Sequence, residues 1–168
     1  LLKQAQSALT ENKLAEAQTA INQAYQLDAD RADIKLVLID IKIQLGNNDE
    51  AQSLLDTIMM ADQDGYYQAL VAKLELATQA ANSPEIQALE AQLETNPDDI
   101  EIKHQLAAQY SQVNRHEEAL TLLFRLVQSG EAQTKEKSKE LFLDVLKALP
   151  GGDAIATKFR RKLYTLLY

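Results

Sequence analysis

Apolar residues recur along the whole chain at steps of three and four positions, which is the spacing of one face of an α-helix. Ala17, Ile21 and Ala24 show this spacing near the beginning of the chain. Beyond Gly130, apolar patterns over 134–149 and 153–168 predict two more helices. With only five Gly and three Pro to interrupt it, this helical spacing predicts an all-α fold.

The helical pattern also repeats along the chain, with a period of 34 residues. Alanine occupies equivalent positions at Ala17, Ala51 and Ala119, and Glu85 takes the fourth. Four residues further on, the same helical face carries an aliphatic residue in every copy. These four residues are Ile21, Leu55, Leu89 and Leu123. A period of this length is typical of a solenoid built from stacked helix pairs.

A 34-residue helix–turn–helix unit with a small residue early in its second helix resembles the tetratricopeptide repeat. The small residue lets the two helices of a repeat approach to about 8–9 Å. Gly46 and Asn114 fall where first helices should end in a left-handed residue. The third repeat departs from the pattern, because Lys73 and Glu85 replace small residues. We expect about four repeats, over 1–31, 32–65, 66–99 and 100–131, followed by C-terminal capping and docking helices over 132–168.

Charge and composition exclude several classes of function. The chain has 168 residues, a formal net charge of -8 and no cysteine, so it has no disulfide, thiol nucleophile or thiolate metal site. Its acidity argues against broad affinity for nucleic acid or anionic membranes. Residues 131–168 differ from the rest, with eight Lys and Arg against five Asp and Glu. Apolar runs are short and interrupted by charges, so no membrane span is expected.

No catalytic or cofactor site is expected. His104 and His116 are interpreted as separate surface histidines. The segment 62–65 resembles the start of a calcium loop, but Lys73 stands where the bidentate glutamate is needed. No phosphate-binding loop, nucleophile elbow or zinc motif occurs. We therefore expect a non-enzymatic protein with no cofactor, metal or small-molecule substrate.

Two surfaces are candidates for binding proteins. The first is a groove formed by the first helices of successive repeats. Its expected residues are Asp33, Leu36, Asp40, Tyr67, Leu70, Leu74, Glu101 and His104. This set lacks the basic residues that clamp a carboxylate tail, and packing between helices is an equally good interpretation of Tyr67, Leu70 and Leu74.

The second candidate is the last helix, where Ile155, Phe159, Leu163 and Leu166 form one apolar stripe. We expect Phe159 and Leu163 to be mainly structural. The residues expected to contact a partner are Arg160, Arg161, Tyr164, Leu167 and Tyr168. Simple capping of the solenoid and a solvated basic face remain alternatives.

The segments 139–149 and 158–168, with the run 86–99, resemble the C-terminal part of the chaperedoxins, bacterial thioredoxin-like co-chaperones of the YbbN type. The resemblance implies a preceding thioredoxin domain, which agrees with a chain that starts on a helical pattern without Met. It also implies a cytoplasmic holdase that protects unfolded clients under stress. By the same resemblance, the helix from Phe159 to Tyr168 docks on the chaperonin GroEL.

Three hypotheses follow. In the first, the chain is a protein-interaction module that docks on a chaperonin through its last helix and binds clients on its concave surface. In the second, it is a scaffold that selects substrates for an attached thioredoxin-like oxidoreductase through the groove. The third, binding of nucleic acid or membrane by the basic end, is opposed by the acidity of residues 1–130.

Overall fold

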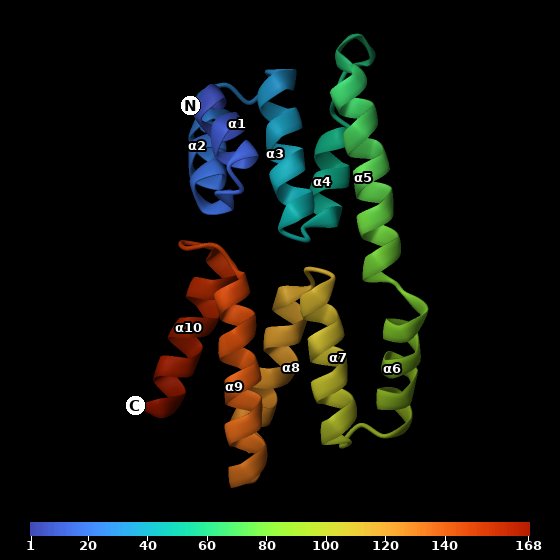
Figure 1. The fold of residues 1–168 in the computed structure, drawn as a ribbon, viewed down its shortest axis with the longest axis vertical. Helices are drawn as coiled ribbons and strands as arrows, with labels where there is room; N and C mark the ends of the chain where they lie inside the picture. Colours follow the sequence, from blue (N-terminus) through green and yellow to red (C-terminus); the bar gives the residue numbers. More distant parts are fainter. The chain divides into compact units, whose positions relative to one another are not determined.

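The computed structural model describes residues 1–168 and is all-α (Figure 1). The helices of the first, second and fourth expected repeats pair as predicted, and the all-α architecture confirms a tetratricopeptide-like solenoid. Their bounds are α1 Leu2–Thr10, α2 Leu14–Leu27, α3 Ala32–Gln44, α4 Asn48–Leu55, α5 Gly65–Ala81, α6 Pro84–Thr95, α7 Ile100–Gln112, α8 His116–Ser129, α9 Ala132–Ala148 and α10 Ala154–Leu167, with a 3-10 turn at Met60–Asp62.

The chain forms two compact units, Leu1–Gln79 and Ala80–Tyr168. The division falls in the last turn of α5, so α5 and α6, which make up the third expected repeat, do not form a helical hairpin inside either unit. This is the repeat whose sequence departs from the pattern, and its Glu85 is exposed at the start of α6. The expected boundary at residue 131, between repeats and C-terminal helices, stays a prediction about roles.

The small residue of the repeat lies where the sequence predicts it. Ala17, Ala51 and Ala119 each have no exposed surface, and each lies in the first half of the second helix of a pair. A larger side chain at these positions would push the paired helices apart, because interiors are packed without spare volume.

The first unit has two adjoining cores. One, around Ile21, Ile41 and Ala5, joins α1, α2 and α3. The other joins α3, α4 and α5 around Ile39 and Leu70. α3 serves both cores, which explains why apolar residues surround it rather than forming a single stripe.

The turns inside three helix pairs share one hydrogen-bonding arrangement. Asn12, Gly46 and Asn114 have positive φ, at 59°, 77° and 63°. In each turn the next amide donates to a carbonyl five residues earlier, as in the Schellman motif. The three bonds are Lys13 N to Ala8 O at 2.8 Å, Asn47 N to Lys42 O at 2.9 Å, and Arg115 N to Tyr110 O at 2.8 Å. Asn12 extends the 34-residue period that predicted Gly46 and Asn114.

The second unit has a single core to which α6, α7, α8, α9 and α10 all contribute. Its largest fully buried side chains include Phe142 of α9 and Phe159 of α10. Side-chain caps start three of these helices, each accepting a bond from the amide three residues on. The caps are Ser83 to Ile86, Asp99 to Ile102 and Asp153 to Ala156. The carboxylates of Asp99 and Asp153 therefore help to determine where α7 and α10 begin.

Candidate protein-interaction surface

The start of α10 is determined by the residues just before it. The chain breaks at Pro150, and Gly152 adopts a φ of +80° that other residues rarely tolerate. The carboxylate of Asp153 then accepts a hydrogen bond from the amide of Ala156 at 2.9 Å. These features determine where α10 begins and therefore which side chains face the core.

The inner face of α10 is part of the core. Phe159 and Leu163 are buried, and the ring of Phe159 lies 6.0 Å from that of Phe142 and 6.5 Å from that of Phe124. The two residues are structural, as expected. They cannot contact a partner while α10 is packed in the core of the second unit. Within the segment 159–168 that the resemblance assigns to docking, these two side chains position the helix rather than contact the partner.

The last turns of α10 expose apolar surface. Tyr164 is 67% exposed, Leu167 47% and Tyr168 91%, and the two tyrosine rings lie 5.0 Å apart. Leu166, predicted on the buried stripe, is 39% exposed. The C-terminal end of α10 lies at the outer edge of the unit, so its last turn has fewer neighbours (Figure 1). Exposed aromatic and aliphatic side chains on a fixed helix are typical of an interaction surface.

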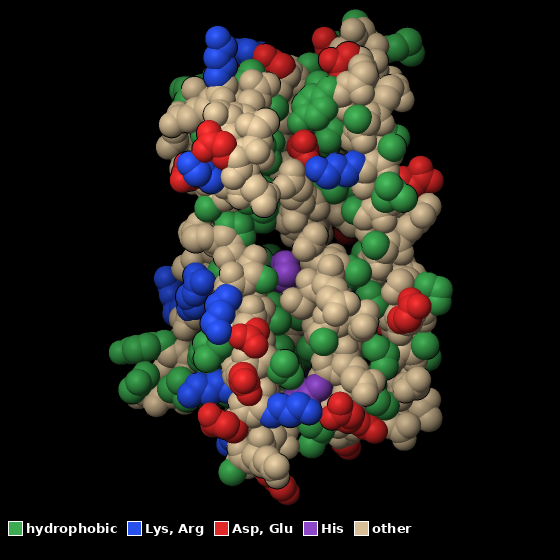
Figure 2. All heavy atoms as spheres, viewed as in Figure 1, with side chains coloured by type: hydrophobic (Ala, Val, Ile, Leu, Met, Phe, Trp, Pro, Cys, Tyr) green, Lys and Arg blue, Asp and Glu red, His purple; other side chains and the backbone are tan.

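The basic residues of α10 differ in their partners. Lys158 forms an ion pair with Glu117 of α8 at 2.6 Å, and Arg160 donates to the carbonyl of Leu146 at 3.4 Å. Arg161 and Lys162 form no ion pair. Figure 2 shows Lys and Arg side chains gathered over the C-terminal helices. Two of the four cations therefore remain available to a partner.

The expected groove is largely filled by packing. Leu36, Leu70 and Leu74 are buried in the core that joins α3, α4 and α5, so they do not line an open groove. Tyr67 is half-buried against the same core. Asp33 is exposed but is bound by the guanidinium of Arg31. The packing alternative therefore describes Leu70 and Leu74, and in part Tyr67, while the burial of Leu36 corrects its place in the groove.

Asp40, another expected groove residue, lies at the centre of a polar cluster in the first unit. It accepts hydrogen bonds from Lys73, from the hydroxyl of Tyr66 at 2.8 Å and from the amide of Gln44 at 3.0 Å. Burial disfavours the ionised carboxyl, but these bonds together outweigh it and lower the pKa of Asp40. The cluster joins α3 to α5 and leaves Asp40 little capacity for a ligand.

The two histidines are buried, which corrects their interpretation as surface residues. His104 of α7 faces α9, and its Nε2 is 2.8 Å from the hydroxyl of Ser138 on α9. Burial lowers the pKa of both histidines. Charged residues lie near both histidines in the sequence and suggested surface positions. The sequence did not show that α9 covers His104. Glu101, one turn before, is exposed and pairs with Lys137.

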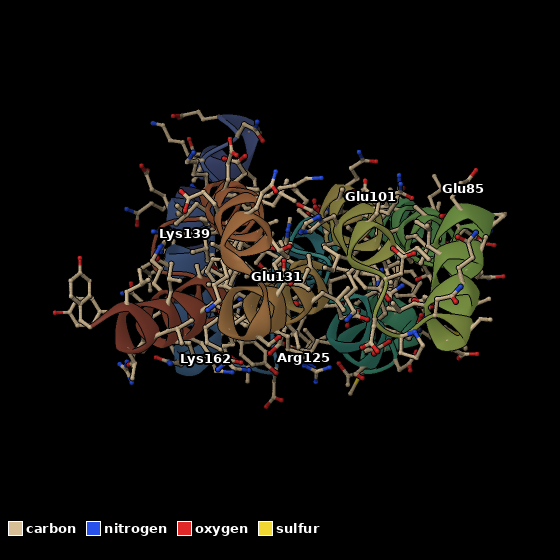
Figure 3. All side chains as sticks on the ribbon, turned by 90° about the horizontal axis from the view of Figure 1, so that it is seen from below. Glu85, Glu101, Arg125, Glu131, Lys139 and Lys162 are labelled. Carbon is tan, nitrogen blue, oxygen red and sulfur yellow. The ribbon has the colours of Figure 1, made fainter.

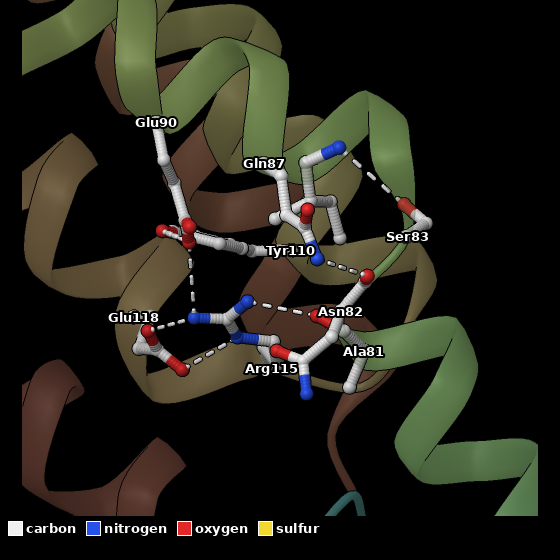
Figure 4. A network of polar contacts seen from close by, with 9 residues as sticks. Ala81, Asn82, Ser83, Gln87, Glu90, Tyr110, Arg115 and Glu118 are labelled. Carbon is white, nitrogen blue, oxygen red and sulfur yellow. Dashed lines mark hydrogen bonds and ion pairs between the residues drawn. The ribbon is translucent and has the colours of Figure 1, made fainter.

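A second polar cluster, which the sequence did not reveal, joins α6 to α7 and α8 (Figure 4). Arg115 bonds Glu118, Glu90 at 3.3 Å and the carbonyl of Ala81 at 2.8 Å. Its guanidinium carbon lies 4.1 Å from the centre of the Tyr110 ring. Burial and a hydrogen bond donated to Glu90 at 2.6 Å raise the pKa of Tyr110. Only the helix-turn position of Arg115, beside the left-handed Asn114, could have suggested a structural role.

Comparison with known proteins agrees with this architecture. Two profiles described as tetratricopeptide repeat match the chain, one over residues 79–168 and one over 8–74. The chain belongs to the tetratricopeptide repeat family. It is 38% identical over 149 residues to an uncharacterised protein of Haemophilus influenzae, with 88% of this chain and 68% of that protein covered.

A solved structure is also similar to this chain. It is a domain of a Vibrio parahaemolyticus protein of unknown function, with a TM-score of 0.89 and 42% identity. The match covers 99% of this chain and 98% of that domain. The similarity therefore extends over both units.

Tetratricopeptide repeats are protein-interaction folds and are generally non-catalytic, which supports a protein-binding role. No three His, Asp or Glu side chains are grouped as metal ligands. None of the helices combines the length and the apolar character needed to cross a bilayer.

Proposed function

We propose that this chain is the protein-interaction module of a cytoplasmic thioredoxin-like co-chaperone, and that it docks on a GroEL-type chaperonin through the end of α10. The observation that carries the proposal is the division of α10 into two faces. Phe159 and Leu163 hold the helix in the core, while Tyr164, Leu167 and Tyr168 point away from it. The resemblance to chaperedoxins supplies the chaperonin as partner.

Client binding at the expected groove has less support. Of its eight residues, Leu36, Leu70, Leu74 and His104 are buried, and Asp40 is held by its own neighbours. Asp33, Tyr67 and Glu101 are left to contact clients, and they do not form a continuous apolar surface. The burial pattern therefore favours docking by α10 over a substrate-selecting groove as the main role.

A triple substitution at the exposed end of α10, Tyr164→Ala, Leu167→Ala and Tyr168→Ala, tests the docking. Removing residues 159–168 is unsuitable, because it would also remove Phe159 and Leu163 from the core. Affinity for purified GroEL, measured by biolayer interferometry, should fall by at least about tenfold if these side chains are the anchors.

A matched control removes apolar surface of similar exposure from the first unit: Leu27→Ala, Met60→Ala and Leu76→Ala. The control should bind GroEL like the unmodified protein, and both variants should keep its melting temperature. Undiminished binding by the α10 variant, or an equal loss in the control, contradicts docking through α10.

A further inference from the structure

A groove of about 640 Å³ runs between α8 and α10 in the second unit. Its floor is apolar and is formed by Phe124, Phe159 and Leu166. Its edges carry polar side chains from both helices: Thr121, Arg125 and Gln128 from α8, and Arg161, Lys162 and Thr165 from α10. The groove is thus large enough for a few residues of a bound peptide.

The charge of this groove is entirely positive. Arg125, Arg161 and Lys162 line it, none of them forms an ion pair, and no carboxylate lines it. Glu117, about one turn before Thr121 on α8, is already paired with Lys158 at 2.6 Å. In a chain with a net charge of -8, this local excess of unpaired cations is distinctive.

The cations are set beside the apolar floor. The ammonium of Lys162 lies 5.1 Å from the centre of the Phe159 ring and 5.7 Å from that of Phe124. Figure 3 shows Arg125 and Lys162 along the same side of the unit, away from Lys139 of α9. A ligand that matches the groove therefore needs negative charge next to an apolar group.

An acidic peptide matches these features better than nucleic acid does. A nucleic-acid surface needs a long row of cations that follow a phosphate backbone. Here only three cations line the site, and the residues before 131 carry a negative balance. An apolar floor suits a leucine or phenylalanine side chain, and guanidinium groups suit carboxylates.

We propose that the α8/α10 groove binds an acidic segment of a partner protein. One apolar side chain of the segment packs on the half-buried Phe124 ring and on Leu166, and flanking Asp or Glu carboxylates pair with Arg125, Arg161 and Lys162. The proposal rests on the protein-interaction role of the chain and does not depend on the partner being a chaperonin.

The probe for this groove is a fluorescein-labelled peptide with a central Phe-Leu pair flanked by glutamates. A companion peptide replaces every glutamate with glutamine. Fluorescence anisotropy with the full 168-residue protein should show binding of the acidic peptide that weakens as salt is raised. Equal binding of the glutamine peptide, or no binding of the acidic one, overturns the proposal.

Paired substitutions locate the binding site. Arg125→Gln with Arg161→Gln should weaken acidic-peptide binding by about tenfold, because two charge-assisted contacts are lost. Lys135→Gln with Lys139→Gln removes the same charge from α9, outside the groove, and should leave the affinity within about twofold. An equal loss in both variants indicates long-range charge alone and overturns the proposal. So does an oligonucleotide or an anionic vesicle that binds at the groove more tightly than the peptide.

The two proposals fail in different ways. If the protein binds the acidic peptide through Arg125 and Arg161 but does not bind GroEL, the chaperonin is the wrong partner and the groove assignment stands. If it binds GroEL through Tyr164, Leu167 and Tyr168 but ignores the peptide, the groove assignment is wrong and chaperonin docking stands.

Discussion

Phe142 of α9 and Phe159 of α10 meet edge to face, with ring centroids 6.0 Å apart and ring planes inclined by 69°. Both side chains are fully buried, and the half-buried Phe124 of α8 lies beside them. One aromatic cluster therefore joins the last three helices. Any surface that includes α10 depends on this contact, because a helix of 14 residues is marginal by itself in water.

Phe159→Ala should lower the free energy of unfolding of the second unit by about 3–5 kcal/mol, since it leaves a cavity among packed rings. Urea denaturation followed by circular dichroism measures the loss. Tyr168→Ala, on the same helix but exposed, should change it by less than about 0.5 kcal/mol. Similar effects from the two substitutions would show that α10 is not anchored by the aromatic cluster.

Arg115→Gln should destabilise the second unit by about 1–3 kcal/mol, because Glu90 and the carbonyl of Ala81 lose their charged donor. Arg115→Lys should recover only part of the loss, since one ammonium cannot reach three acceptors in the planar geometry of a guanidinium. Urea denaturation compares the variants. Full recovery by lysine would mean that only the net charge matters here.

Asn114→Ala should cost about 1 kcal/mol of stability, because an alanine at φ 63° is strained. Asn114→Gly should be close to neutral, since glycine adopts this conformation without strain. Thermal melting of the two variants gives the comparison. If alanine were tolerated as well as glycine, the left-handed turn would not be required for the α7/α8 pair.

Stability should fall as the pH is lowered through about 6.5, the ordinary histidine value. Burial, and for His104 also the nearby Lys137, lowers the pKa of both histidines, against opposing effects of Glu101 and Asp153. The unfolded chain then takes up protons before the folded one does, so protonation favours unfolding. The contribution is fully present above the unfolded pKa and is lost below it.

Urea denaturation between pH 8 and 5 measures this effect. A His104→Gln, His116→Gln variant should lose less stability over that interval than the unmodified protein, although it starts from a lower value. In the folded protein a proton on Nδ1 of His104 would be a buried donor without an acceptor. An unchanged pH slope in the variant would contradict the role of these histidines.

Most of the local structure followed from the sequence. The 34-residue period predicted three of the helix pairs, the buried Ala17, Ala51 and Ala119, and the left-handed turns at Gly46 and Asn114. It also marked the third repeat as irregular, which is where the chain divides into two units. These features depend on side-chain size, helical period and backbone conformation over a few residues, and a sequence displays such properties directly.

The candidate site was predictable only in part. The stripe on α10 correctly identified Phe159 and Leu163 as core residues, but it also included Leu166, which is partly exposed. Leu36, Leu70 and Leu74 were expected in a groove and lie in a core. Arg125 was overlooked, although its place on α8 beside Phe124 marks a cation next to a core aromatic.

The sequence by itself determined the helices, three of the helix pairs and the left-handed turns within them, because those depend on residues close together in the chain. Only the tertiary structure decided which surfaces remain open. It buried His104 beneath α9, enclosed Asp40 with Lys73, and brought Arg125 of α8 beside Arg161 and Lys162 of α10. The physical reason is that exposure and charge neighbourhood depend on which helices face one another, and residues distant in sequence supply those neighbours.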